Sequence, residues 1–404
     1  MPRALLLFAI VSLTVAGCNG KSVEEDAGTG GTGGTSGTGG TSGTGGAPPA
    51  PLGTLWVGGS GSLSPVALLD GGETVAFGKN CSPPGYSSTN PLDGAGVIDG
   101  QGNLWSQFGD GTVGQADSAP IYKWSASQLG SCASSTPDIF PLADFLYCGG
   151  EGGGCNPFFS VLAFDSEGNL WGTESTSSEP AILVYRAADL SGAGQSLTAA
   201  ALFPASGCAL INGLCEPLGL AFDSAGYLWI GNGYSVAGYS PATQLAIMGG
   251  DAGSPPADLV LTTPQALAYD GGQGFGSDYN FNYLAFDRSG NLWADVDSDI
   301  EHQIVEFSKA QLQNLSTDKT PTPVLTVTET PFQSGHVFLG WGALAFDADG
   351  NLWAGASMFN PDLYRFSPAS LADGGLPDIT LIVPGDPSLS LVFDPIPSGL
   401  PLRQ

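Results

Sequence analysis

A ten-residue unit that recurs along the chain constrains its fold more than any other feature. The unit reads Leu-Ala-Phe-Asp, two variable residues, Gly, then Asn or Tyr, Leu and Trp. Its four full copies end at Trp171, Trp229, Trp293 and Trp353, and a shorter copy ends at Trp105. Successive tryptophans lie 58 to 66 residues apart. A recurring period of this kind predicts an architecture assembled from repeated structural units.

Each repeat contains the pattern of four short strands. In the last full copy, apolar or alternating runs occupy residues 343–346, 352–356, 362–366 and 379–383. The Asp and Gly between the first two runs are turn residues, because Asp accepts hydrogen bonds from nearby backbone N–H groups and Gly tolerates positive φ. Four strands in each repeat predict an all-β fold, a β-propeller with four-stranded blades.

The two ends of the chain predict how the propeller closes. The segment Leu52–Val57 begins with a Leu-Trp strand but has no Phe-Asp strand before it, whereas Leu389–Asp394 supplies a spare strand of that kind. We expect this C-terminal strand to complete the first blade and so remove an open sheet edge. With five internal copies, this makes six blades. A seventh is disfavoured, because its candidate start at 266–270 lacks the Gly-Asn-Leu-Trp continuation.

The N-terminal segment has the features of an export signal. Arg3 precedes an apolar run from Leu5 to Val15, and small residues lie before Cys18. The string Leu-Thr-Val-Ala-Gly-Cys resembles the lipobox of bacterial lipoproteins, which predicts a signal peptide over 1–17 and an acylated Cys18. An ordinary secretory signal is the alternative. Asn19, in place of the Asp that often retains such proteins at the inner membrane, favours the outer membrane.

A linker is predicted over residues 18–51, before a propeller domain at 52–404. After Val23 the linker contains no apolar side chain larger than Ala or Pro and is dominated by Gly, Thr and Ser. Such a segment cannot bury enough apolar surface to offset the conformational entropy lost on ordering, so we expect it to be disordered.

Six cysteines remain once Cys18 is set aside. An even number in an exported protein predicts disulfides. Short loops favour two self-closing pairs and leave one further pair: Cys148–Cys155, Cys208–Cys215 and Cys81–Cys132. Zinc is the alternative, but the sequence has no Cys-x-x-Cys spacing.

The charge of the chain restricts its partners. It has 38 acidic and 10 basic residues, a formal net charge of −28. Nucleic acids and anionic membrane surfaces are excluded, because contacts to phosphate need Lys and Arg. We expect a monomer that meets the membrane through its lipid anchor only and that has a protein, glycan or small-molecule partner.

The repeat resembles that of the NHL and gluconolactonase-like propellers, including virginiamycin B lyase-like proteins, over nearly all of residues 52–404. The resemblance implies the architecture more strongly than a function, because such propellers include hydrolases, lyases, binders and scaffolds. A gluconolactonase-like protein would carry a divalent-metal site of Glu, Asn and Asp at the channel mouth. A lyase-like protein would carry a catalytic His and a Glu-bound Mg²⁺, and neither His302 nor His336 lies in a convincing match. No catalytic residue is therefore assigned.

Candidate ligand-binding residues lie in the segments that follow each Leu-Trp strand or precede each Leu-Ala-Phe-Asp strand. Carboxylates and amides beside aromatic walls can form a ligand pocket at a channel mouth. The alternative is that these residues are solvated loop tips and packing residues. The candidates are Glu174, Glu216, Asn232, Tyr283 and Trp341.

A candidate metal site follows the third full copy of the unit, which ends at Trp293. Alternating carboxylates at Asp295, Asp297, Asp299 and Glu301 would place several oxygens on one side of an extended segment, which suits Ca²⁺ or another divalent cation. However, Ile300 stands where an EF-hand needs Gly. A plain acidic loop is the alternative.

The aspartate of each repeated turn could suggest a ring of acids, but its position favours a cap for the turn. The sequence therefore predicts a lipid-anchored envelope or cell-surface propeller that acts as a binding or scaffold module. A metal-dependent hydrolase or lyase of the gluconolactonase-like type is the alternative.

Overall fold

The computed structural model describes a defined part of the chain. The described residues are 53–59, 62–68, 76–77, 81, 95–107, 120–129, 131, 135–142, 159–174, 181–204, 217–232, 235–249, 255–262, 280–297, 302–316, 318–328, 341–356, 362–373, 377–382 and 390–394. The predicted signal peptide, Cys18 and the linker lie outside them, as does the segment 266–270. Residues Pro48–Gln404 make up one compact unit.

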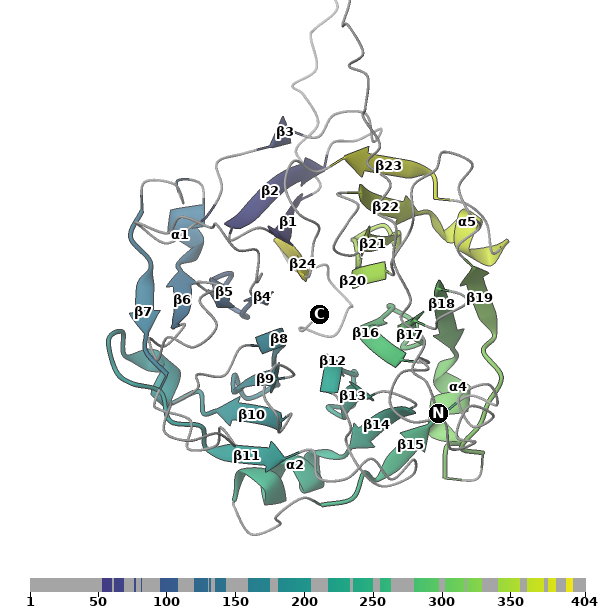
Figure 1. Ribbon diagram of the computed structural model, residues 1–404, viewed down its shortest axis with the longest axis horizontal. Coiled ribbons are helices and arrows are strands. Elements are labelled where there is room, and N and C mark those ends of the chain that lie inside the picture. The colour runs from purple at the N-terminus through teal and green to yellow at the C-terminus, as the bar shows by residue number, and fades with distance from the viewer. Residues whose placement is uncertain are drawn as a thin grey trace, which may run out of the picture. The chain divides into compact units, whose positions relative to one another are not determined.

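The described strands form six antiparallel sheets of four strands each, shown in Figure 1. The sheet that joins the two chain ends contains β24 (Ser390–Asp394), β1 (Gly53–Gly59), β2 (Ser62–Leu68) and β3 (Ala76–Phe77). The next two contain β4 (Gly96–Ile98), β5 (Leu104–Gln107), β6 (Ile121–Trp124) and β7 (Asp138–Phe140), then β8 (Phe159–Phe164), β9 (Leu170–Glu174), β10 (Ala181–Tyr185) and β11 (Ala201–Pro204).

The remaining three sheets follow the same order. They contain β12 (Pro217–Phe222), β13 (Leu228–Asn232), β14 (Ser235–Tyr239) and β15 (Leu259–Leu261); β16 (Asn280–Phe286), β17 (Leu292–Asp297), β18 (His302–Phe307) and β19 (Leu325–Thr328); and β20 (Trp341–Phe346), β21 (Leu352–Ala356), β22 (Asp362–Phe366) and β23 (Ile379–Ile382). Short helices follow some third strands: α1 (Ala126–Leu129), the 3-10 turn η2 (Asp189–Ser191), α2 (Pro241–Met248), α4 (Lys309–Gln313) and α5 (Pro368–Ala372). No helix in these described segments has the length and apolar character needed to cross a membrane.

The first strand of each repeat lines the centre. Strand β4 contacts β8, and the contacts continue through β12, β16, β20 and β24 back to β4. The sheets therefore radiate from a closed inner ring, which establishes an all-β propeller (Figure 1).

The repeated turn holds the first two strands of a sheet together through its aspartate. The Asp165 Oδ1 atom accepts the backbone N–H groups of Glu167 and Asn169, each at 2.9 Å. Its Oδ2 atom accepts the Asn169 side-chain amide at 2.7 Å and the Trp171 indole N–H at 3.0 Å. The same arrangement, which we call the Asp clamp, recurs at the equivalent aspartates Asp99, Asp287 and Asp347, and at Asp223 without the amide bond, because Tyr227 replaces the asparagine there. The interpretation of these aspartates as turn caps is confirmed.

The same motif also joins neighbouring sheets. The Trp of one sheet packs against the Phe of the next sheet's Leu-Ala-Phe-Asp strand, with ring centroids 5.8–6.3 Å apart. The pairs are Trp105–Phe164, Trp171–Phe222, Trp229–Phe286 and Trp293–Phe346. The core therefore lies between the sheets, and its anchors come from the repeated sequence itself.

The predicted closure by the C-terminal strand is confirmed. Strand β24 pairs antiparallel with β1, from Thr54 opposite Asp394 to Gly58 opposite Ser390. Leu391 and Phe393 are buried and join a cluster of side chains from β1, β20, β21 and β22. The ring is thus completed by strands from the two ends of the propeller domain.

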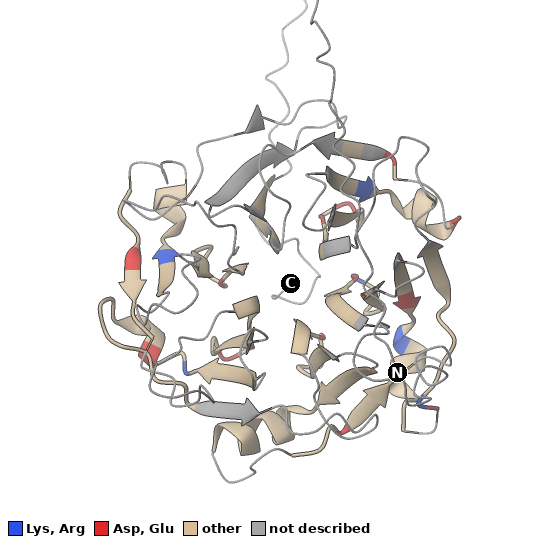
Figure 2. Cartoon of the chain, viewed as in Figure 1, with Lys and Arg blue, Asp and Glu red and all other residues tan. Residues whose placement is uncertain are grey.

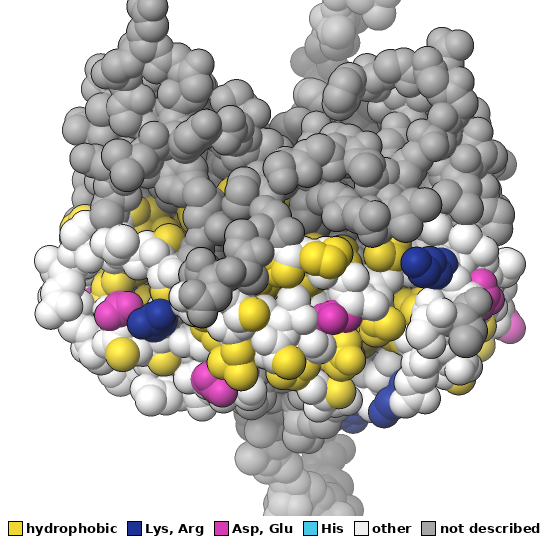
Figure 3. All heavy atoms as spheres, turned by 90° about the horizontal axis from the view of Figure 1, so that it is seen from below, with side chains coloured by type: hydrophobic (Ala, Val, Ile, Leu, Met, Phe, Trp, Pro, Cys, Tyr) yellow, Lys and Arg dark blue, Asp and Glu magenta, His cyan; other side chains and the backbone are white. Residues whose placement is uncertain are grey.

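Charged side chains are sparse on the described residues. Figure 2 shows the lysines and arginines scattered around the ring rather than gathered in one patch. Seen from one edge in Figure 3, single charged side chains lie among hydrophobic and uncharged polar ones.

Candidate functional site

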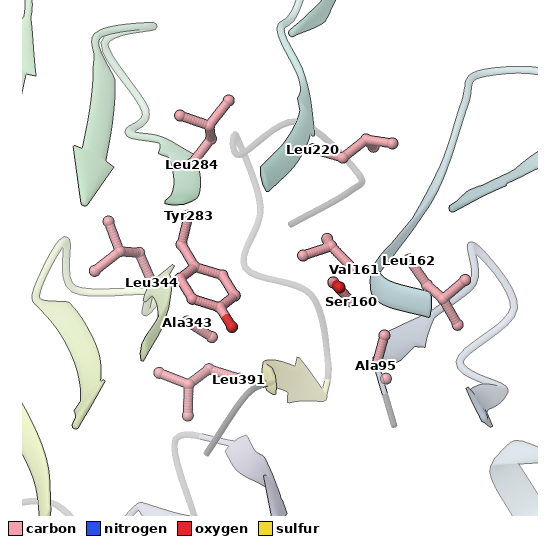
Figure 4. A pocket seen from close by; sticks show the side chains of 11 residues that line it. Ala95, Ser160, Val161, Leu162, Leu220, Tyr283, Leu284, Ala343, Leu344 and Leu391 are labelled. Carbon is pink, nitrogen blue, oxygen red and sulfur yellow. The ribbon is translucent and has the colours of Figure 1, made fainter. Parts of the chain in front are cut away.

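The six innermost strands enclose a small apolar cavity on the channel, shown in Figure 4. Its volume is about 40 Å³, and every innermost strand or the residue beside it contributes to the lining. The lining residues are Ala95, Gly96, Ser160, Val161, Leu162, Leu220, Tyr283, Leu284, Ala343, Leu344 and Leu391. A space of this size holds a few water molecules and is much smaller than a ligand pocket, so a ligand would have to bind at an end of the channel.

Irregularities in four of the inner strands shape this cavity. The register shifts in β8, β12, β16 and β20, each time near the start of the strand. A β-bulge of this kind turns side chains away from regular alternation and is common beside functional sites. Ser160 and Tyr283 lie at two of these bulges, and Figure 4 shows the Tyr283 ring projecting into the cavity. They supply its polar side chains.

The topology brings several predicted site residues to one end of the sheets. Glu174 ends β9, Asn232 ends β13 and Asp297 ends β17, while Trp341 begins β20. In each sheet this is the end opposite the Asp clamp, and the inner strands of a propeller run in the same direction. These four positions therefore share one face of the propeller, which we call the mouth face.

The structure corrects the expectation that these residues lie in loops. Glu174 pairs with Phe159 and Ala181, and Asn232 pairs with Pro217 and Ser235, so both are terminal residues of the sheet ladder. The Leu-Trp strands extend further than the apolar pattern suggested, because backbone pairing continues through the polar residues. Glu216 lies outside the described residues, immediately before β12.

The predicted metal ligands do not form one exposed loop. Asp295 is fully buried within β17, where its Oδ2 atom accepts a hydrogen bond from the Asn282 side-chain amide at 3.3 Å. Asp297 is the last residue of β17, and Asp299 and Glu301 lie outside the described residues. Among the residues that the structure describes, no group of three or more His, Cys, Asp or Glu side chains could hold a metal ion.

Asp295 belongs to a set of structural positions that the sequence analysis missed. It lies two residues after the repeated Trp, where other sheets have the fully buried Gln107 and Thr173. Gln107 Oε1 accepts the backbone N–H of Phe159, at 2.7 Å, on the inner strand of the next sheet. Thr173 also bonds to the next sheet, but as a donor: its Oγ1 hydroxyl donates to the Leu218 carbonyl at 3.4 Å. The fixed spacing from Trp is the signal that could have identified this position.

The same position carries glycine where neighbouring sheets approach more closely. A Cβ atom added at Gly231 would lie 2.5 Å from the carbonyl oxygen of Phe281 on the next inner strand. The position two residues after Trp therefore links adjacent sheets, either through a polar side chain or through close backbone packing. Asp295 occupies the same position, and the hydrogen bond from Asn282 that it accepts comes from the inner strand of its own sheet.

The cysteine predictions fall largely outside the described residues. Cys81 is buried and disulfide-bonded. Its predicted partner Cys132 and the four cysteines of the other two pairs are not among the described residues. The pairing scheme stays a prediction.

No family model matches the chain, and no curated protein sequence matches it. Among solved structures, the chain is similar to a protein from Lactobacillus plantarum, with 16% identity, a TM-score of 0.48 and coverage of 83% of each chain. It is also similar to a periplasmic gluconolactonase from Pseudomonas aeruginosa, with 15% identity, a TM-score of 0.47 and coverage of 82% of this chain and 84% of that one.

A more distant similarity is to a catalytically inactive virginiamycin B lyase from Staphylococcus aureus. The identity is 11% and the TM-score 0.39, with coverage of 72% of this chain and 70% of that one. At these values the similarities carry no activity over to this chain.

Proposed function

We propose that the protein is a six-bladed, lipid-anchored propeller that binds a protein, glycan or small-molecule ligand at its mouth face. The observation that supports this proposal is the position of Glu174, Asn232 and Trp341 at the same end of three different sheets. A carboxylate, an amide and an indole are residue types that ligand sites combine. The cavity lined by the innermost strands, at about 40 Å³, is too small to be the site itself.

The test is a binding screen on the full chain. A glycan array and a small-molecule thermal-shift screen would be run on the wild type and on a Glu174→Gln, Trp341→Ala double variant. We expect ligands of the wild type to lose at least tenfold in affinity for the double variant. Glu167→Gln, at an exposed position on the opposite face, is the matched control. Ligands that bind the double variant and the wild type equally would refute the mouth face as the site.

The second candidate is a metal-dependent hydrolase or lyase. Asp297 ends β17 on the same face as Glu174 and Asn232, and carboxylate and amide oxygens suit Ca²⁺ and Mg²⁺. Calorimetric titration of the metal-free chain with Ca²⁺, Mg²⁺ or Mn²⁺ separates the two functions. Tight binding that Asp297→Asn removes, together with metal-dependent lactone hydrolysis, would favour the enzyme.

A further inference from the structure

A second cavity, of about 300 Å³, lies between the sheet β16–β19 and the sheet β20–β23. It opens at the end of the sheets that carries the Asp clamps, away from the mouth face. Its apolar walls include Trp293, Phe346 and Leu371, and its charged residues are Asp287, Arg288 and Glu306. This volume lies at the lower end of the range for small-molecule pockets.

An equivalent cavity between the sheets β8–β11 and β12–β15 provides an internal comparison. It measures about 110 Å³ and uses the same repeat positions: Asp165 and Phe222 stand where Asp287 and Phe346 stand in the larger cavity. Gln244, Leu245 and Met248 of the eight-residue helix α2 line the smaller cavity. Helix α5 has only five residues and offers Leu371 and Ala372 there. The larger cavity also reaches Trp293, Glu306 and Leu325, whereas the counterpart Trp171 does not line the smaller one.

The larger cavity also differs in the residue opposite its tryptophan. In two other sheets, the third-strand residue paired with Trp places a cation over the indole: Lys123 Nζ lies 4.8 Å from the Trp105 ring centroid. The Arg365 guanidinium lies 5.9 Å from the Trp353 ring. In the sheet β16–β19 this position is Glu306, opposite Trp293. This sheet thus has a carboxylate at the position where the two other sheets have a lysine or an arginine.

Glu306 is oriented by a hydrogen bond, and its surroundings disfavour its negative charge. Its Oε1 atom accepts a hydrogen bond from the Asn291 side-chain amide at 2.8 Å, and its pKa is raised, first by burial and then by the neighbouring charge of Asp287. Asp287 itself is engaged in the clamp, with Asn291 and Trp293 as donors. A cation beside Glu306 would offset the cost of a partly buried carboxylate near another one. Arg288 is exposed, where water and salt screen its charge.

We propose that this cavity binds a small organic cation, an ammonium or guanidinium group on a short apolar body. Glu306 is the counter-ion and the Trp293 indole contacts the cation, while Phe346, Leu325 and Leu371 surround the apolar body. This site is separate from the mouth face, so it does not depend on the function proposed above.

The experiment is a calorimetric titration of the full chain with benzylammonium and with the neutral benzyl alcohol at pH 7.5. We expect benzylammonium to bind at least tenfold more tightly than the alcohol and Glu306→Gln to remove this difference. Glu167→Gln changes an acid in the equivalent smaller cavity and is the matched control, for which we expect unchanged affinity.

A second variant, Glu306→Arg, would supply the cation from the chain, as Arg365 does for Trp353. We expect it to lose benzylammonium binding while keeping its melting temperature. Equal binding of the cation and the alcohol, equal effects of Glu306→Gln and Glu167→Gln, or no binding of benzylammonium at millimolar concentration would each overturn the proposal.

Discussion

Replacing the clamp aspartate Asp165 with alanine should destabilise the propeller by about 3–7 kcal/mol. The carboxylate is 6% exposed and accepts four hydrogen bonds. The Asn169 amide and the Trp171 indole N–H would lose their acceptor inside the protein, and each buried donor left without one costs about 1–3 kcal/mol. The backbone N–H groups of Glu167 and Asn169 lose the same acceptor, and the loss of such a cap adds about 1 kcal/mol.

Urea denaturation of the wild type and the variant measures this difference directly. Trp171→Phe removes one donor and keeps most of the ring, so we expect it to cost less than Asp165→Ala. Because the two groups are bonded to each other, the double variant should be more stable than the sum of the two single effects predicts, by about 1–2 kcal/mol.

Asp223→Ala provides a graded control in another sheet. Tyr227 replaces the clamp asparagine there, and Asp223 accepts three hydrogen bonds, from the N–H groups of Ala225, Tyr227 and Trp229. We expect a smaller loss than at Asp165. An Asp165→Ala cost below about 1 kcal/mol, or additive effects in the double variant, would show that the clamp does not hold the strands together.

Three further predictions test other parts of the molecule. Removing residues 388–404 should unfold or aggregate the protein, because it deletes the inner strand β24, whereas removing residues 28–46 should leave the melting temperature unchanged; equal melting curves for both would contradict closure. Cys18→Ser should move the protein from the membrane fraction to the soluble one, and retention after a salt wash would contradict the predicted acylation. Burial raises the pKa of Glu306 above its ordinary value of 4.5, so its contribution to stability is present below that value and is lost as pH rises through the raised pKa. The free energy of unfolding, measured from pH 4 to 8, should therefore fall less for Glu306→Gln than for the wild type.

The repeat made the fold predictable because one short motif specifies several contacts at once. Asp, Gly and Trp in fixed order determine a turn, a hydrogen bond across it and an anchor for the next sheet. Asp165, Gly168 at φ +83° and Trp171 show all three. The closure was predictable from the same motif. Residues 389–394 repeat the first strand of a sheet, and the sheet that begins with Leu52–Val57 was the one without such a strand.

The candidate site was less predictable, because an alternating pattern of polar residues does not reveal which of those side chains are buried. Asp295 and Asp297 look alike in an alternating acidic segment, yet Asp295 is buried between sheets and Asp297 ends the strand. The cavity at Glu306 was missed for a different reason. It is lined by Glu306, Leu325 and Leu371 as well as by Trp293 and Phe346, and the residues of the third and fourth strands and of the helix are not part of the repeated motif.

The sheet that closes the ring is held together differently from the others. In those sheets the Asp clamp connects the first strand to the Trp strand through a continuous turn, but β24 and β1 come from distant parts of the chain. The indole nitrogen of Trp56 is buried and has no hydrogen-bond partner among the described residues, whereas that of Trp171 binds Asp165. Backbone pairing and the burial of Leu391 and Phe393 must therefore supply the stability that the clamp supplies elsewhere. Losing a large buried aromatic side chain costs about 3–5 kcal/mol by itself, so Phe393→Ala alone should weaken the closure of the ring by an amount that urea denaturation can measure.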